Sequence, residues 1–123
     1  MNKLLFESKT RGSSRTIEIN SKEVIFDKNG TKTNYKIKPE EWERMLLVTD
    51  LIPLNEIADM KSPTSKRLSD RALHSKIVIE TTDKTYSSQT FDDLHPPKPL
   101  LELMKFLIQL DEDYHHGGEL FFD

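Results

Sequence analysis

Short segments with alternating polar and apolar residues fill the first third of this chain, and they constrain its fold more than any other feature. Thr16–Ile19 has the two-residue period of a half-buried β-strand. Leu4–Ser8, Glu23–Phe26 and Thr33–Ile37 are typical of three further strands. Asp27–Gly30 separates the last two, and its Asn-Gly pair accepts the positive φ angles of a tight hairpin. The first part of the chain therefore predicts an antiparallel meander.

The period changes at Pro39, where we expect a helix to begin, because proline suits a first helical turn. Four residues then recur at helical spacing and form one helix face: Trp42, Met45, Leu46 and Thr49. Pro53 ends this helix, and a further short turn follows it. We interpret Trp42 as a core anchor rather than a ligand-stacking residue.

The second half repeats this order with fewer strands. Ile77–Glu80 and Thr85–Phe91 predict a hairpin, with Tyr86 and Phe91 on opposite faces. A second helix follows the three nearby prolines, and Leu100 begins its apolar face. Because strands cluster instead of alternating with helices, the predicted fold is α+β. We expect an antiparallel sheet of about six strands packed by two main helices, in the order ββββ-α-ββ-α.

The length of 123 residues suits one domain, which we place at residues 1–110. Residues 111–123 are predicted to form an acidic, fraying tail, since five acidic residues and no Lys or Arg give it a charge of −5. Leu120–Phe122 is an apolar exception, and it either docks on the body or forms a stub for a partner.

The composition excludes several kinds of chemistry. The chain has no cysteine, which rules out disulfides, thiolate metal sites and cysteine nucleophiles. No Gly-rich phosphate loop is present, and a net charge of −3 without a basic aromatic patch disfavours nucleic acid. His115 and His116 are adjacent, so they predict no shared metal site. We expect no cofactor and no catalytic residue set.

The chain also lacks a run of roughly 20 apolar residues, so we expect no membrane association. Its apolar start stops at Glu7, well short of the roughly 7–15 residues of a secretory apolar core. The expected compartment is the cytoplasm.

Polar side chains in residues 61–97 form the candidate binding loop. Residues 61–76 contain five basic residues against one acidic residue, a charge of +4. The two ends of an antiparallel hairpin lie side by side, so we expect this loop to adjoin residues 91–97. The structural interpretation is that Asp92 or Asp93 caps the last helix or a turn, and that Asp70 pairs with Lys66 or Arg71. The candidate set is Lys61, Lys66, Arg67, Asp70, Arg71, His74, Asp92 and His95.

Short motifs in this region resemble those of a group of small uncharacterised bacterial α+β proteins. The matching residues are Pro63-Thr64, Lys66-Arg67, Asp70-Arg71-Ala72, Lys84-Thr85-Tyr86, Phe91-Asp92, Pro96-Pro97 and Leu100, within residues 39–110. Arg71 stands where that group would have a glycine. The resemblance implies a stand-alone α+β domain, with Asp70 and Phe91-Asp92 fixing the loop to the hairpin. It implies no activity.

Three functions stay open at this point. The leading one is a non-catalytic binding domain whose basic loop meets a protein surface or a small anionic ligand. The second is a small hydrolase in which Asp70, His74, Asp92 and His95 act as base and orienter, with Ser69, Ser87 or Ser88 as the hydroxyl. The third is an inhibitor or immunity-type protein that blocks a basic site through its acidic tail.

Overall fold

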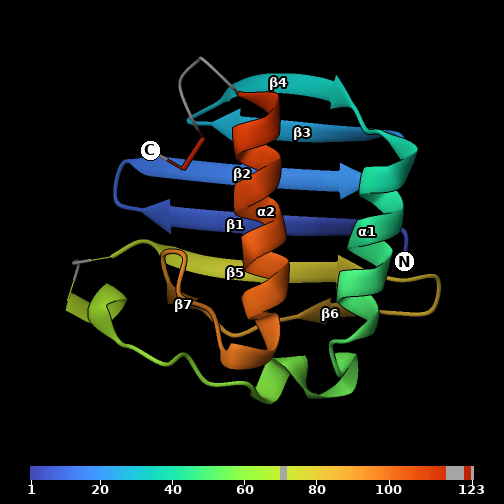
Figure 1. The fold of residues 1–123 in the computed structure, drawn as a ribbon. Coiled ribbons are helices and arrows are strands. Elements are labelled where there is room, and N and C mark those ends of the chain that lie inside the picture. The colour runs from blue at the N-terminus through green and yellow to red at the C-terminus, as the bar shows by residue number, and fades with distance from the viewer. Residues whose placement is uncertain (70–71, 116–120, 123) are drawn as a thin grey trace.

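An antiparallel sheet of seven strands forms the centre of the protein, as the computed structural model, which describes residues 1–69, 72–115 and 121–122, shows in Figure 1. Six strands lie in the order β4-β3-β2-β1-β5-β6, and β7 also pairs with β5. The predicted α+β fold and its element order are therefore confirmed. The strands are β1 (Lys3–Thr10), β2 (Ser13–Asn20), β3 (Glu23–Lys28), β4 (Thr31–Lys36), β5 (His74–Glu80), β6 (Thr85–Ser87) and β7 (Phe91–Asp92).

Two-residue turns connect the first hairpins. The β3–β4 turn is formed by Asn29 and Gly30, with φ angles of +56° and +92°. The side chain of Asp27 accepts the Gly30 N–H at 2.9 Å, which fixes this turn. The Asn-Gly hairpin signal is thus confirmed, because both positions need the left-handed backbone that these residue types tolerate.

Two helices cover one face of the sheet (Figure 1). They are α1 (Pro39–Asp50) and α2 (Leu101–Tyr114). The short helices η1 (Leu54–Asp59), η2 (Lys66–Ser69) and η3 (Lys98–Leu100) lie in the connections. No helix formed by the described residues is both long and apolar enough to cross a bilayer.

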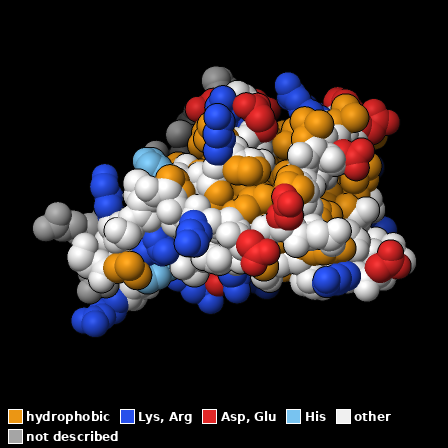
Figure 2. Space-filling view, turned by 90° about the horizontal axis from the view of Figure 1, so that it is seen from below, with side chains coloured by type: hydrophobic (Ala, Val, Ile, Leu, Met, Phe, Trp, Pro, Cys, Tyr) orange, Lys and Arg blue, Asp and Glu red, His pale blue; other side chains and the backbone are white. Residues whose placement is uncertain are grey.

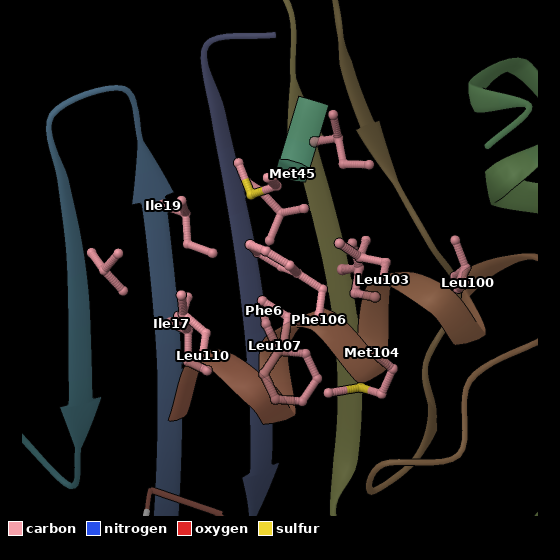
Figure 3. Packing of buried hydrophobic residues seen from close by; sticks show 14 of the residues in the cluster. Phe6, Ile17, Ile19, Met45, Leu100, Leu103, Met104, Phe106, Leu107 and Leu110 are labelled. Atoms are coloured by element: carbon pink, nitrogen blue, oxygen red, sulfur yellow. The ribbon is translucent and has the colours of Figure 1, made fainter. Parts of the chain in front are cut away.

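The core lies between this sheet face and the two helices (Figure 3). Phe6 and Ile17 reach it from the sheet, Met45 from α1, and Leu103 and Leu107 from α2. All five side chains are fully buried. Trp42 packs against this core while staying partly exposed, which agrees with its interpretation as an anchor.

Residues 85–91 do not form one strand, as the pattern had predicted, because an extra residue interrupts their pairing with β5. Val78 pairs with Ser87, and Ser75 pairs with Phe91. Residues 88–90 therefore lie opposite only two residues of β5. An unequal count of this kind is a β-bulge, which bends the strand and re-aims the side chains that follow.

The side chain of Ser88 completes the bulge. The Ile77 N–H donates to Ser88 Oγ at 2.9 Å, and the Ser88 N–H donates to the Ile77 carbonyl at 2.9 Å. The shift places Tyr86 and Phe91 on the same core-facing side, so their predicted opposite orientation is wrong. Asp92 consequently lies on the other face, directed toward the loop.

The beginning of the segment predicted as an acidic tail is helical. Helix α2 ends at Tyr114, so residues 111–114 of the predicted tail belong to it. Asp111 is buried, and Phe121 and Phe122 pack on the body, so the described part of the late apolar segment docks. Residues 116–120 lie outside the described residues.

Candidate functional site

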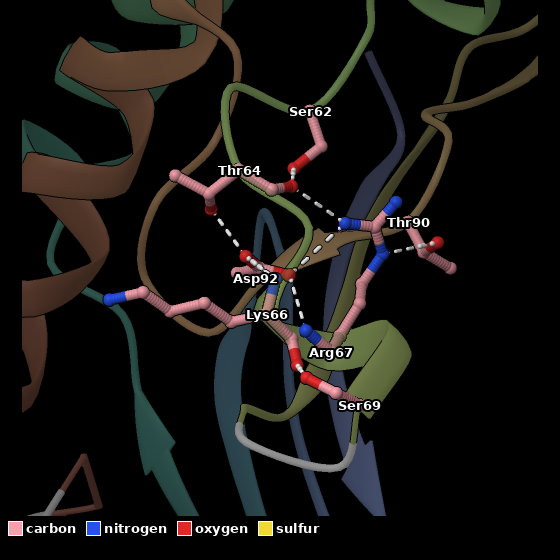
Figure 4. Close-up of polar contacts among 7 residues, drawn as sticks. All are labelled: Ser62, Thr64, Lys66, Arg67, Ser69, Thr90 and Asp92. Carbon is pink, nitrogen blue, oxygen red and sulfur yellow. Dashed lines mark hydrogen bonds and ion pairs between the residues drawn. The ribbon is translucent and has the colours of Figure 1, made fainter.

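Asp92 joins the loop predicted as a binding site to the hairpin (Figure 4). The hydroxyl of Thr64 and the main-chain N–H of Lys66 donate to Oδ2, the latter at 2.7 Å. The main-chain N–H and Nη1 of Arg67 donate to Oδ1 at 2.9 and 3.0 Å. We call these four residues the Asp92 cluster. They confirm that the loop adjoins residues 91–97.

The electrostatics of the Asp92 cluster favour the ionised form of its carboxylate. Burial by itself raises the pKa of Asp92, but the hydrogen bonds from Thr64, Arg67 and Lys66 outweigh it and hold this pKa well below its usual range. The two backbone donors belong to the first turn of η2. Asp92 therefore caps a turn, as one structural interpretation of the sequence proposed, and the turn is η2 rather than the last helix.

The loop groups best suited to bind an external anion already bind Asp92. The Arg67 side chain is 13% exposed and also donates from Nε to Thr90 Oγ1 at 3.1 Å. Lys61 and Lys66 are exposed, and the Lys66 side chain points away from Asp92 in Figure 4. Asp70 and Arg71, two more members of the candidate set, lie outside the described residues.

The two histidines of the candidate set lie near Asp92 without engaging its carboxylate. His74 pairs with Asp92 across the β5–β7 ladder, and the His95 main-chain N–H donates to the Asp92 carbonyl at 2.8 Å. Among the described residues, no hydrogen bond or ion pair joins either imidazole to the Asp92 carboxylate. A carboxylate already held by four donors is poorly suited to orient a catalytic base.

Two of the three hydroxyl groups that the hydrolase hypothesis names, those of Ser69 and Ser88, have their own local partners. Ser88 donates to the Gln89 carbonyl at 2.9 Å, and Ser69 donates to the Lys66 carbonyl at 3.2 Å. In the described part of the chain, therefore, the geometry lends the hydrolase hypothesis no support.

A second polar cluster, which sequence reasoning missed, surrounds Asp111 on α2. Its carboxylate accepts the main-chain N–H groups of Phe121 and Phe122 at 2.8 and 3.1 Å. His115 Nδ1 lies 2.7 Å from Asp111 Oδ1. We call these four residues the Asp111 cluster. Its only sequence signal was an Asp and a His four residues apart, in a segment interpreted as tail.

Aromatic packing surrounds the Asp111 cluster. The ring centroid of Phe26 lies 4.6 Å from that of His115 and 5.5 Å from that of Phe121. Tyr114 donates its hydroxyl hydrogen to Glu41 Oε1 at 2.6 Å, and burial together with this carboxylate raises the pKa of Tyr114. The polar groups here link the end of α2 to the start of α1, which gives them a structural role.

An open apolar groove lies beside α1, on the side away from both polar clusters. Its volume is about 620 Å³. We call it the α1 groove, and its lining residues are Met1, Glu43, Leu46, Leu47, Thr49, Asp50, Leu54, Ile79 and Thr81. Leu47 is 69% exposed at its edge, and Leu51, one helical turn further on, is 80% exposed.

Two acidic side chains, Glu43 and Asp50, line the α1 groove, and the segment that forms its wall is acidic. Figure 2 shows the hydrophobic side chains gathered in the upper right of the view, with acidic side chains at their margin. Residues 39–59, which span α1 and η1, contain six acidic residues against Arg44, a charge of −5. Glu40, Glu43, Asp50, Glu56 and Asp59 are all exposed.

In its described residues, the protein is an α+β fold with two helices on one sheet face, the Asp92 and Asp111 clusters inside it, and the α1 groove on its surface. No protein-family model matches the chain, and neither the curated proteins nor the solved structures give a match. No group of three or more potential metal ligands occurs among the described residues. The resemblance to small bacterial proteins stays a prediction.

Proposed function

We propose that this protein is a non-catalytic interaction domain that binds a partner protein along α1 and η1. One observation carries the proposal: Leu47 and Leu51 are exposed one helical turn apart, beside the α1 groove. Single exposed leucines are ordinary on protein surfaces, whereas contiguous apolar surface rimmed by polar residues marks interaction sites. Burying these two side chains against a partner would remove two of the three most exposed large apolar side chains on the described surface, the third being Leu68.

The candidate binding loop is a weaker site for the same function. Arg67 and the first N–H groups of η2 already hold Asp92, so an external anion would meet mainly Lys61 and Lys66. Exposed lysines are strongly hydrated and give weak, salt-sensitive contacts. The loop stays the alternative place for a protein surface or a small anionic ligand.

A comparison of three variants tests the proposal. Gln replaces Leu47 and Leu51 in the first variant, because it keeps helix propensity while removing the apolar contact. Leu68→Gln is the matched control, since Leu68 is 74% exposed on η2. Lys61→Glu with Lys66→Glu reverses the charge of the loop. A partner that the wild-type protein retains on a column should be lost only by the first variant. Loss by the loop variant alone would show that the proposal has the wrong site.

An inhibitor or immunity-type protein is the second candidate, and the acidic surface of residues 39–59 favours it. Such a surface can cover the basic site of a target enzyme. The tail is a poorer choice because Asp111 points inward and holds Phe121 and Phe122. Neutralising Glu43 and Asp50 should then weaken inhibition of the target, while neutralising Glu112 and Asp113 should leave it unchanged.

The proposed setting is the bacterial cytoplasm, in agreement with the resemblance to small bacterial proteins. Fractionation of the source cells would check this, and recovery of the protein outside the cytoplasmic fraction would contradict it.

A further inference from the structure

We propose that the occupant of the α1 groove is a basic amphipathic helix of a partner protein. This inference rests on the interaction function proposed above and adds the chemistry of the partner. Three properties of the described groove carry it: its walls, its apolar ridge and its charge.

The walls of the groove suit a helix better than an extended strand. A peptide that binds as a strand needs an unpaired sheet edge to supply main-chain hydrogen bonds. The lining comes instead from Leu46 on α1, Leu54 at the start of η1 and Met1 just before β1. Ile79 and Thr81, at the end of β5, complete it. Side chains, rather than a free strand edge, therefore meet the occupant.

The exposed leucines supply the packing ridge. Leu47 lies in the last turns of α1, and Leu51, four residues further on, is the residue that ends this helix with a helical backbone conformation, so the two side chains follow one another along the same face. Ridges of this spacing pack into the grooves of a neighbouring helix. A partner helix with apolar residues at i, i+3, i+4 and i+7 would bury both leucines and fill the apolar space beside them.

The charge of the groove favours cations on the partner. Glu43 and Asp50 line the groove, and α1 has no basic residue in its last turn. The C-terminal end of a helix is also the negative end of its dipole, which adds to the charge of Asp50. Arg44 does not neutralise this side, because it lines a separate hollow with Glu102 and Lys105 toward α2.

A second copy of the chain fits the groove less well. In a two-fold symmetric dimer the same patch meets itself, which would set these acidic residues against one another. A head-to-tail contact with the basic loop of another copy is the remaining self-association, and the experiment below detects it.

The test uses two synthetic peptides of about 18 residues, five helical turns each. Both carry leucine at i, i+3, i+4 and i+7, and one has lysine where the other has glutamate. The methyl signals of Leu47 and Leu51 are followed by NMR during titration. The lysine peptide should shift both signals saturably, while the glutamate peptide should leave them unchanged.

Variants then separate the two contributions to binding. Leu47→Gln with Leu51→Gln should weaken binding of the lysine peptide by about tenfold or more. Glu43→Gln with Asp50→Asn should weaken it by roughly threefold at low salt. Leu68→Gln and Glu112→Gln are matched controls on exposed positions elsewhere, and they should leave the affinity unchanged.

Several outcomes overturn the inference. They are that the lysine peptide does not bind, that both peptides bind equally well, or that ultracentrifugation shows the chain alone to self-associate through Leu47 and Leu51. A failure of the inference differs from a failure of the proposed function. Suppose that Leu47→Gln with Leu51→Gln abolishes binding of a partner, and that the partner segment cross-linked to position 51 proves to be acidic or extended. The proposed interaction function would then stand, and the inference of a basic helix would be wrong.

Discussion

The Asp92 cluster and the α1 groove differ in how far their groups are satisfied within the protein. Asp92 carries a buried charge, and two donors bind each of its oxygens. The α1 groove carries two exposed leucines and an acidic margin. Polar residues that look functional in a sequence can be fully hydrogen-bonded within the fold, whereas leucines that look structural can stay exposed and available to a partner.

Because of this difference, we expect changes at the Asp92 cluster to affect stability and changes at the exposed leucines to affect binding. A change in the Asp92 cluster leaves several donors unpaired in a buried place, which is costly. A change at the exposed leucines alters little within the folded chain. The predictions below use this contrast, from the largest expected effect on stability to the smallest.

Asp92→Asn should cause the largest loss of stability. The amide cannot accept from all four donors, so at least one donor and the charge of Arg67 lose their partner. We expect the melting temperature to fall by at least about 5 °C. Trypsin should also cleave faster after Lys66 and Arg67. Asp93→Asn is the matched control, and an equal effect of both changes would contradict this role of Asp92.

Asp111→Asn should destabilise the C-terminal end of α2 by about 2 kcal/mol, since it weakens the acceptors of two buried N–H groups. Urea unfolding measures the change, and loss of the ring-current shifts of Phe121 and Phe122 locates it. Glu112→Gln should have no comparable effect. If Asp111→Asn left these aromatic signals unchanged, the carboxylate would not be what holds the segment.

Acid should destabilise the Asp92 cluster selectively. Because the folded pKa of Asp92 lies below its ordinary value of 3.8, this group stabilises the fold fully above that pH. Its contribution is lost as pH falls through 3.8 toward the folded pKa. The difference in unfolding free energy between the wild type and Asp92→Asn should therefore shrink below about pH 4. A constant difference down to pH 2 would contradict the ionised carboxylate.

Leu47→Gln with Leu51→Gln should have the smallest effect on stability. Both side chains are largely exposed, so we expect the unfolding free energy to change by less than about 0.5 kcal/mol. Thermal and urea unfolding of this variant and of Leu68→Gln should agree. A large loss would mean that the two leucines already pack within the protein, and the contrast with Asp92 would fail.

Much of the fold could be predicted from the sequence because local patterns determine it. The Asn29-Gly30 turn and the helical period after Pro39 needed no long-range information. The bulge at Ser88 could not be predicted, since it depends on which residues of β5 lie opposite. That single extra residue reversed the expected face of Phe91 and directed Asp92 toward the loop.

The sites were predicted less completely. Proximity of the loop to Asp92 followed from hairpin geometry, but the donors that satisfy Asp92 include backbone N–H groups, which no residue type reveals. The role of Asp111 depends on Phe121 and Phe122 folding back from ten and eleven residues further on. The exposure of Leu47 and Leu51 depends on which neighbours cover the end of α1, because a helical period alone does not say where the apolar face ends.

The most direct test of the central claim is to measure the affinity of the lysine-rich helical peptide for two variants in parallel. One removes Leu47 and Leu51, and the other reverses the charges of Lys61 and Lys66. The account predicts that the first variant loses about tenfold or more in affinity while the second keeps the wild-type value or binds slightly better. Loss of binding in the loop variant, with retention in the leucine variant, would contradict it.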